Sequence, residues 1–212
     1  MRENKSQTFA GAIELYLPEF DSPPVDPIEL FRKWFEKAKA QGVREPDALA
    51  LGTADRAGRA SVRFVQMVSI TGAGLVFITN DGSQKGRDIA ATRWASGVLY
   101  WRETKQQLIL AGLVERLSPT ESNALWNARP ADTHLMSIAS QQSAPLENEQ
   151  ALRREAQRLA EVGEPLLRPE DWSGYHLVAD MVEFWQEGPD LLHRRLRYDK
   201  TGDGWTTRRL QP

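Results

Sequence analysis

The residues in this chain best suited to chemistry are cations placed where a phosphate group could bind. Arg63 lies in the run Arg63-Phe-Val-Gln-Met-Val68, on a strand face that otherwise carries small and polar side chains. A guanidinium offers a two-pronged fork to a phosphate dianion, although a solvated strand arginine is the ordinary alternative. The segment Gly82-Ser83-Gln84-Lys85-Gly86 falls between a predicted strand and a predicted helix, where free N–H groups, the helix dipole and Lys85 favour an anion. The alternative is that this segment is an ordinary turn before a helix. A phosphate, however, needs two or more cationic or N–H-rich groups around it, so the Arg63 run and this segment support each other as parts of one site.

Further polar and aromatic side chains are candidates for ligand contacts. Gln107 begins a strand and Gln142-Ser143 lies in a polar loop. Side-chain amides can read the donor and acceptor edge of a ligand ring, although an exposed Gln usually has no such role. Trp185 lies at the end of a strand, and its ring could pack either against a cofactor or against another subunit. On a strand Arg195 and Arg197 share a face, so at most a part of this basic cluster serves one site.

Neither a catalytic residue nor a metal site emerges from the sequence. The chain has no Cys and only three widely spaced His residues. Disulfides, thiolate catalysis and Cys- or His-based metal motifs are therefore excluded. No nucleophile–base pair is indicated either. Chemistry on a bound cofactor needs little acid–base help from the protein, because the cofactor carries the reactive atom.

The composition describes an ordinary globular chain of 212 residues, 41% hydrophobic and 26% charged. A formal net charge of -2 gives no electrostatic case for a nucleic-acid partner. The polar N-terminus lacks the apolar region of a secretory signal, and no stretch of about 18 apolar residues could span a membrane. We expect a cytoplasmic protein with no membrane partner.

Short strands and inserted helices must position these residues. Residues 1–26 are polar and then Pro-rich, which predicts a flexible N-terminal arm before a single domain, 27–212. Asp26-Pro27 begins a helix that Gly42 closes, and Ser118 begins another through a capping box. Asp132 can cap a further short helix. A short helix is predicted at 84–93 and a long helix at 147–162.

About eight strands are predicted, mostly linked by short turns. In one of them, 59–70, apolar residues occupy even positions, which is the alternation of a half-buried strand. The pattern favours a closed or nearly closed antiparallel barrel. The predicted strands span residues 48–54, 59–70, 75–80, 97–102, 106–117, 175–185, 191–199 and 205–210.

Taken in order, these segments resemble the pyridoxine/pyridoxamine 5′-phosphate oxidase family of flavin enzymes over about residues 25–212. The resemblance implies a mainly β fold with inserted helices, a split antiparallel β-barrel, and a homodimer with FMN at the subunit interface. The motifs that carry it are Asp26-Pro27, Arg63-Phe-Val, Phe77-Ile-Thr79-Asn80, Gly82-Ser83 with Lys85, Gln107, Arg129-Pro130 with Asp132, Gln142-Ser143, Glu183-Phe-Trp-Gln186, Leu192-His193 with Arg195, and Arg209-Leu210-Gln211-Pro212.

The resemblance also implies which residues contact FMN. Gln84 stands where the family often has an Arg, which weakens the expected hold on the phosphate. The phosphate or ribityl contacts are Arg63, Gln84, Lys85, Gln142 and Ser143; the strand segments along the flavin are Phe64, Val65, Gln66, Ile78 and Thr79; the ring and interface contacts are Gln107, Trp185 and Arg195.

The implied substrate pocket departs from the family pattern. Val68, Leu125 and Leu191 replace a Lys, a Tyr and an Arg that hold a phosphorylated substrate in the family. The counterparts that remain are Arg129, Thr133 and His193. Each charge-assisted hydrogen bond contributes roughly 1.5–3 kcal/mol, so the lost contacts weaken phosphate binding by several kcal/mol. We expect a wider, more apolar pocket for a flat and mostly hydrophobic molecule.

This pattern is similar to the members of the family that act in phenazine biosynthesis. It implies an FMN-dependent oxidase that aromatises a reduced phenazine carboxylic acid, with O2 as electron acceptor and H2O2 as product, and with Arg129 or His193 holding the carboxylate. The alternative is a pyridoxine/pyridoxamine 5′-phosphate oxidase that uses other anchors. A third possibility is a split-barrel module that binds flavin or haem without turnover.

Overall fold

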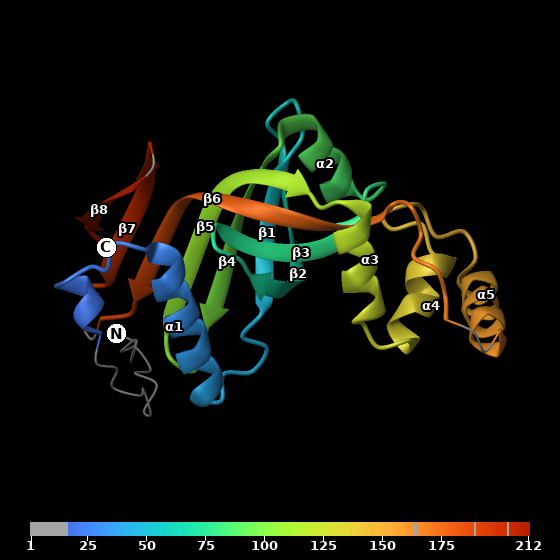
Figure 1. Cartoon of the computed structure of the whole chain (residues 1–212), viewed down its shortest axis with the longest axis horizontal. Coiled ribbons are helices and arrows are strands. Elements are labelled where there is room, and N and C mark those ends of the chain that lie inside the picture. Colours follow the sequence, from blue (N-terminus) through green and yellow to red (C-terminus); the bar gives the residue numbers. More distant parts are fainter. Residues whose placement is uncertain (1–16, 163–164, 189, 203) are drawn as a thin grey trace, which may run out of the picture. The chain divides into compact units, whose positions relative to one another are not determined.

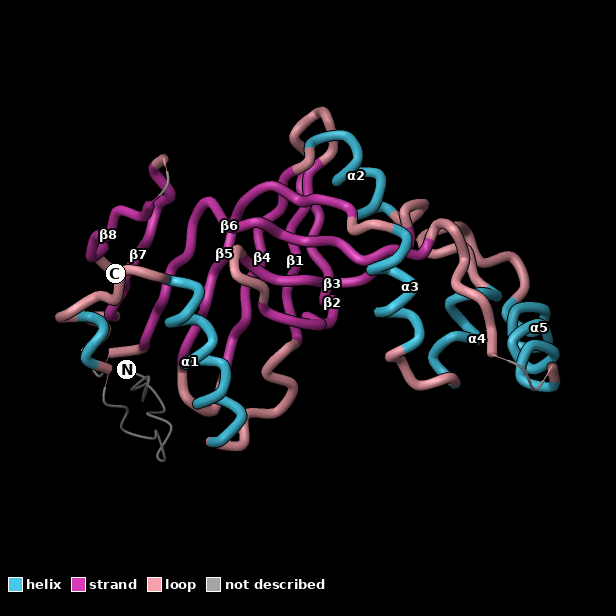
Figure 2. Tube along the Cα trace, viewed as in Figure 1, coloured by secondary structure: helices cyan, strands magenta, loops and turns pink. Residues whose placement is uncertain are grey.

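The computed structural model describes residues 17–162, 165–188, 190–202 and 204–212. Figure 1 shows the course of the chain and Figure 2 its helices and strands. The elements are η1 (Pro18–Phe20), α1 (Pro27–Ala40), β1 (Ala48–Ala54), β2 (Ala60–Ile70), β3 (Gly74–Asn80), α2 (Gln84–Thr92), β4 (Trp94–Trp101), β5 (Gln106–Arg116), α3 (Pro119–Asn127), α4 (Asp132–Ala139), α5 (Glu149–Glu161), β6 (Trp172–Gln186), β7 (Arg194–Thr201) and β8 (Gly204–Leu210).

The chain divides into two compact units. The barrel unit comprises Asp47–Gly97 and Leu110–Asp180; the terminal unit comprises Met1–Pro46, Val98–Ile109 and Met181–Pro212. The strand order is β3-β2-β1-β4-β5-β6-β7-β8, with an additional β3–β6 pairing. That pairing closes β1 to β6 into a six-stranded antiparallel barrel, as the strand pattern predicts.

Close packing of β6 against its neighbours closes the barrel unit. A Cβ on Gly74, at φ 159°, would lie 1.9 Å from the Leu177 carbonyl oxygen. A Cβ on Gly112 of β5 would lie as close to the Val178 carbonyl oxygen. Only glycine allows backbones to approach so closely. Inside the barrel, alternate residues such as Leu49, Leu51, Leu75, Phe77 and Leu177 are fully buried.

The alternation predicted for β2 is present, but its apolar face is the exposed one. Val62 and Phe64 are 70% and 76% exposed, whereas Ser61 and Arg63 are half-buried. In the β1–β2 register, Val62 lies opposite Gly52 and Phe64 opposite Ala50, so β1 adds only small side chains to this face. The result is a flat, apolar outer surface on the barrel unit.

Helices α3, α4 and α5 follow β5 in the barrel unit and lie together in Figure 1. The predicted capping box of α3 is present, since Ser118 accepts from the Glu121 N–H and Glu121 accepts from the Ser118 N–H. For α4 the prediction was wrong in detail. Ala131 occupies the N-cap, and Asp132 is the first helical residue without a capping bond. A carboxylate at that position is stabilised by the helix dipole instead.

The terminal unit has an aromatic core beneath α1. Asp26 accepts from the Ile28 N–H and Pro27 occupies the first turn, as predicted. The Trp34 ring meets that of Phe184 edge-on at 5.0 Å, and Trp101 lies 6.4 Å from Trp34. Trp34 also donates to Glu19, which ties η1 to the helix.

The predicted N-terminal arm is only partly covered by the structure. Residues 1–16 lie outside the described residues. Of the remainder, Phe20 is buried, its ring contacts the guanidinium groups of Arg194 and Arg209, and Tyr198 donates to the Pro24 carbonyl oxygen. The arm and the boundary at residue 27 stay predictions. In the described part of the chain, no helix has the length and apolar character to cross a membrane.

Candidate functional site

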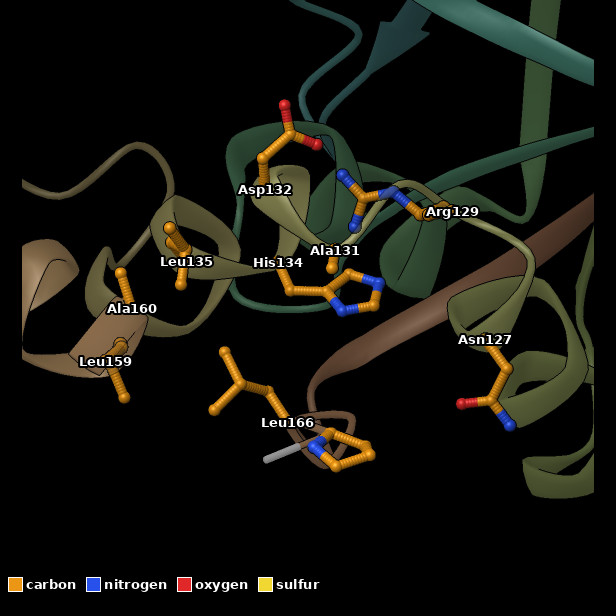
Figure 3. A pocket seen from close by; sticks show the side chains of 10 residues that line it. Asn127, Arg129, Ala131, Asp132, His134, Leu135, Leu159, Ala160 and Leu166 are labelled. Atoms are coloured by element: carbon orange, nitrogen blue, oxygen red, sulfur yellow. The ribbon is translucent and has the colours of Figure 1, made fainter. Parts of the chain in front are cut away.

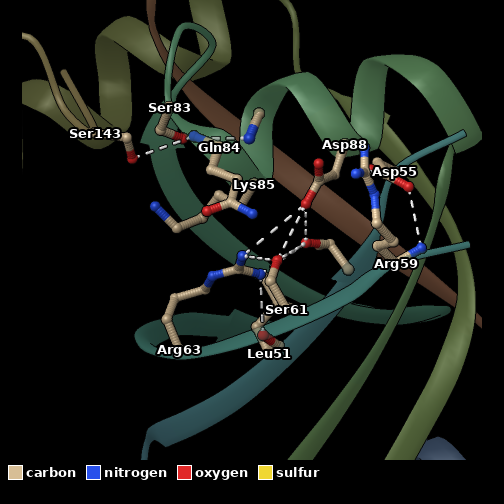
Figure 4. Close-up of polar contacts among 12 residues, drawn as sticks. Leu51, Asp55, Arg59, Ser61, Arg63, Ser83, Gln84, Lys85, Asp88 and Ser143 are labelled. Carbon is tan, nitrogen blue, oxygen red and sulfur yellow. Dashed lines mark hydrogen bonds and ion pairs between the residues drawn. The ribbon is translucent and has the colours of Figure 1, made fainter. Parts of the chain in front are cut away.

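A cluster of cations and hydroxyl groups lies in the barrel unit where β2, β3 and α2 meet (Figure 4). Ser83 caps α2 and is fully buried, accepting from the Gly86 N–H at 3.2 Å. A Cβ on Gly86 would lie 2.3 Å from the Asp81 carbonyl oxygen, so glycine lets the first turn pack against the end of β3. This packing places Lys85 next to the barrel rim.

Arg63 is held from below by β1 and β2. Its Nη1 donates to the Leu51 carbonyl oxygen at 3.2 Å and to Thr53 Oγ1 at 2.7 Å, and its Nη2 donates to Ser61 Oγ at 2.5 Å. Asp88 of α2 accepts from both hydroxyl groups, at 2.7 and 3.2 Å, and lies 4.0 Å from Arg63. Arg63 is therefore a fixed cation and not the solvated arginine that was the alternative.

Lys85 is buried without a carboxylate partner. Its Nζ donates to Thr79 Oγ1 and to Gln142 Oε1, both at 3.1 Å. Burial, reinforced by the charge of Arg63, lowers the pKa of Lys85 to about 8. Among the described residues no acidic side chain forms an ion pair with it. A buried ammonium next to a guanidinium is suited to bind an anion that supplies the missing negative charge.

Backbone groups of α2 and the loop after α4 complete this cluster. Ser143 accepts through Oγ from the Gln84 N–H at 3.2 Å, and Gln142 accepts from Thr79 at 3.1 Å. Ser143 adopts a left-handed backbone, φ 73°. The structure thus brings together Arg63, Thr79, Gln84, Lys85 and the Gln142-Ser143 pair, far apart in sequence. Two cations, hydroxyl groups and the positive end of the α2 dipole form a set that fits a phosphate monoester such as that of FMN.

Asp88, Thr53 and Ser61 were missed by sequence reasoning. For two of them the local sequence could have indicated a role. Asp88 follows Lys85 by three residues on α2, and Ser61 precedes Arg63 by two residues on β2, so each shares a face with a predicted site residue. For Thr53 there was no such indication, because its position opposite Ser61 depends on the β1–β2 register.

The other predicted flavin contacts are dispersed over both units. In the barrel unit Val65 and Ile78 are half-buried, Phe64 is exposed, and Gln66 donates to Asp47 at 3.0 Å. In the terminal unit Arg195 pairs with Glu183 at 2.7 Å, and Gln107 and Trp185 are half-buried. Their assignment to a flavin stays a prediction.

The predicted substrate residues are likewise divided. In the barrel unit, Val68 is 42% exposed, and Leu125 packs toward Gly174, where an added Cβ would lie 2.6 Å from its Cδ1. Thr133 donates to the Pro130 carbonyl oxygen at 2.7 Å. In the terminal unit Leu191 is 75% exposed, and the His193 ring lies 4.9 Å from that of Trp185.

A cavity of about 800 Å³ opens beside α3, α4 and α5 in the barrel unit (Figure 3). Arg129 is the one predicted substrate residue among those that line it; His134, which the sequence did not single out, lines it too. The lining residues are Asn127, Arg129, Ala131, Asp132, His134, Leu135, Leu159, Ala160, Pro165 and Leu166.

Two protein-family models match the chain. The model described as pyridoxamine 5′-phosphate oxidase matches residues 35–163. The model described as pyridoxine 5′-phosphate oxidase C-terminal dimerisation region matches residues 172–212. Together they cover most of both units, and the second covers β6, β7 and β8.

Two relatives and one solved structure illustrate the similarity. Dihydrophenazinedicarboxylate synthase from Pseudomonas chlororaphis is 46% identical over 207 residues, which is 98% of this chain and 93% of the relative. The protein of the same name from Burkholderia lata is 43% identical over the full length of both chains. The crystal structure of PhzG from Burkholderia lata 383, in complex with tetrahydrophenazine-1-carboxylic acid, matches with a TM-score of 0.93 and 44% identity, covering 95% of this chain and 100% of that one.

Proposed function

Because the chain belongs to the pyridoxamine 5′-phosphate oxidase family, we propose that it is an FMN-dependent oxidase that aromatises a reduced phenazine carboxylic acid in phenazine biosynthesis. The names of the two dihydrophenazinedicarboxylate synthases support this substrate class, and so does the tetrahydrophenazine carboxylic acid bound by PhzG.

The buried pair of Arg63 and Lys85 is the observation that carries the proposal. Lys85 has no carboxylate partner among the described residues, and the positive end of the α2 dipole lies at the same place. FMN fits this donor set through its phosphate. Thr53, Ser61 and Asp88 keep Arg63 oriented toward it, so little reorganisation is needed on binding.

FMN, held through its phosphate by Arg63 and Lys85, would supply the redox chemistry, which is oxidation of the substrate ring by hydride transfer with O2 as electron acceptor and H2O2 as product. The residues of this chain then have to bind and orient the two rings. Face-to-face stacking of the two rings would position the donor carbon without strong polar anchors. Val68, Leu125 and Leu191 present apolar surface in place of phosphate-binding groups, and Arg129 or His193 holds the carboxylate.

The proposed assembly is a homodimer with FMN at the subunit interface. The match to a dimerisation region supports the homodimer. The exposed apolar face of β2, with Val62 and Phe64, gives a second copy a surface to cover. We assign Gln107, Trp185 and Arg195 to the flavin ring at that interface. All three are half-buried in the terminal unit and keep accessible surface for such a contact.

An anaerobic titration tests the proposal. The purified protein should show a yellow flavin spectrum, and tetrahydrophenazine-1-carboxylic acid should bleach it stoichiometrically. Admission of O2 should restore the colour and release H2O2. Pyridoxine 5′-phosphate, titrated in parallel, should bleach the flavin far more slowly. Bleaching by pyridoxine 5′-phosphate alone would identify a vitamin oxidase instead, and FMN binding without reduction by either donor would indicate a non-enzymatic flavin carrier.

A further inference from the structure

A smaller cavity lies in the barrel unit between the end of β5, the start of α3 and the start of β6. Its volume of about 360 Å³ falls within the range of about 300–1,000 Å³ typical of small-molecule sites. None of the predicted FMN or substrate residues is among the residues that line it. The polar side chains of its wall belong to Arg116, Ser122, Arg168, Glu170 and Ser173.

Arg168 brings a guanidinium to this wall that is fixed in place but lacks an anionic partner. It donates through Nε to Asn123 Oδ1 at 2.7 Å. Through Nη1 it donates to the carbonyl oxygens of Pro169 and Trp172. In the described part of the chain no residue accepts from its Nη2, and no carboxylate forms an ion pair with it. The positive charge of Arg168 is therefore free to pair with an anion.

Arg116 brings a second fixed guanidinium. Its Nε donates to Ser173 Oγ at 2.9 Å, and its Nη2 donates to the Glu170 carbonyl oxygen at 3.0 Å. The same Nη2 lies 2.6 Å from Asp81 Oδ2, which balances its charge. Its Nη1 has no acceptor among the residues that the structure describes. Both arginines thus retain one terminal nitrogen with hydrogens to donate.

Two buried hydroxyl groups add further donors. Ser122 and Ser173 are 2% and 1% exposed. Each hydroxyl oxygen accepts one bond, from the Gly174 N–H at 3.2 Å and from Arg116 respectively. A hydroxyl group also has a hydrogen to donate, and no described residue accepts it from either serine. A buried donor without an acceptor costs free energy, so a ligand that supplies acceptors would be favoured here.

We propose that this cavity binds a tetrahedral oxyanion, either inorganic phosphate or the phosphate group of a small monoester. A phosphate dianion presents acceptor oxygens in several directions, which matches two guanidinium groups and two hydroxyl groups that can only donate. The carbon chain of an ester would contact Leu117 and Pro119, which also line the cavity. Glu170 opposes binding through its charge, but its side chain is exposed and water screens it. This site does not depend on the proposed function.

A phosphate titration of the FMN-loaded protein at constant ionic strength tests the site. FMN occupies the separate cluster around Arg63, and the amide chemical shifts of Ser122, Ser173 and Gly174 report on the cavity itself. These three shifts should move together and saturate. Glycerol 3-phosphate is titrated in parallel. Tighter binding of the ester would identify a phosphate monoester as the ligand, and equal binding would identify the free ion.

Two pairs of variants measure the contribution of the wall. Arg168→Gln should weaken phosphate binding by about tenfold, because a charge-assisted contact is lost. Its matched control is Arg154→Gln, which removes an exposed cation of the same unit outside the cavity and should leave the affinity unchanged. Glu170→Gln should tighten binding by about two- to fivefold, because it removes the opposing charge. Glu161→Gln, an exposed carboxylate of α5 outside the cavity, should have no such effect.

Three results would each overturn this site. One is the absence of saturation in the shifts of the three amides. The others are equal affinities in Arg168→Gln and Arg154→Gln, or in Glu170→Gln and Glu161→Gln. Arg168 also binds backbone carbonyl groups, so its replacement could prevent folding. In that case the exposed Glu170 and its control decide the outcome.

Discussion

Lys85 connects burial, charge and cofactor affinity at the scale of one residue. Its pKa is about 8, below the ordinary value of 10.5, because burial and the nearby Arg63 disfavour the charged amine. In the FMN-free protein the free energy of unfolding therefore rises between pH 8 and the lysine pKa of the unfolded chain, since the unfolded state binds more protons. A bound phosphate dianion has the opposite effect on the pKa of Lys85, because it stabilises the charged ammonium form.

FMN affinity should consequently fall as the pH rises through about 8. Below that pH Lys85 is already protonated; above it, binding must take up a proton, and the dissociation constant should rise by up to about tenfold per pH unit. Quenching of FMN fluorescence between pH 7 and 9.5 measures this. Lys85→Arg, which stays charged throughout, should give a flat profile. Equal slopes in the two proteins would rule out Lys85 as the titrating group.

The three residues that replace the family's phosphate-binding side chains can be tested by restoring those side chains. Val68 and Leu191 are exposed enough to accept longer side chains, whereas Leu125 is confined against Gly174. Val68→Lys, Leu125→Tyr and Leu191→Arg combined should bind pyridoxal 5′-phosphate at least tenfold more tightly, since roughly 1.5 kcal/mol per restored contact more than offsets the strain at 125. An absorbance titration measures this affinity.

A control for the triple variant adds the same two charges elsewhere. Val25→Lys with Leu167→Arg uses two apolar residues that are each 88% exposed. If this pair gains as much affinity as the triple variant, the effect is general electrostatics and the three positions are not the lost anchors.

Single residues could be predicted where the chemistry is local. Arg63 and Lys85 were predicted because a cation beside a strand or a helix start is visible in the sequence, and the structure places both in one cluster (Figure 4). The network around Arg63 was not found, because Thr53 comes next to Ser61 only through strand pairing. Arg129 was predicted as a substrate contact, but its position above two tryptophan rings depends on the packing of α3 and α4 against β6.

At the scale of elements, the start of α2 joins the barrel to the anion cluster. Gly86→Ala would place a Cβ 2.3 Å from the Asp81 and 2.6 Å from the Asn80 carbonyl oxygens, so the first turn must move away from β3. We expect lower thermal stability, and loss of FMN affinity of at least tenfold because Lys85 shifts together with the start of the helix. Thermal denaturation and FMN titration measure the two effects.

Gly82→Ala is the matched control for this element. It changes a glycine four residues earlier, where an added Cβ meets nothing within 4 Å and the backbone is not in the left-handed region. This variant should keep both the melting temperature and the FMN affinity. If Gly86→Ala also keeps them, close packing of α2 on the end of β3 is not required for the site.

Most elements follow from periodicity and capping residues. Pro27 and Gly42 set the limits of α1, and Ser118 sets the start of α3, because these caps act within one helical turn. The burial of β2 is different. The alternation of β2 can be read from the sequence, but the sequence does not say which of its two faces points into the barrel. That choice depends on the hydrogen-bond partners of Arg63 on the inner face and on whatever covers the apolar residues of the outer face.

At the scale of the whole molecule, the exposed apolar face of β2 indicates that another chain covers it in an assembly. A lone barrel would leave Val62 and Phe64 in water beside the small side chains of β1. Burying such apolar surface contributes about 25 cal/mol per Å². A second copy is the occupant that the matched dimerisation region favours.

Val62→Lys should therefore separate the subunits and, with them, the cofactor. The substitution places a charge on the apolar face without touching Arg63, Lys85 or the helices, so the barrel itself should keep its fold. Light scattering coupled to size-exclusion chromatography should show a shift from dimer to monomer, and the monomer fraction should be colourless because FMN lies at the proposed interface. Leu167→Lys, also exposed and in the same unit but outside the face, should remain dimeric and yellow. A Val62→Lys dimer that retains FMN would place the subunit contact elsewhere, and a yellow monomer would show that one chain encloses the flavin alone.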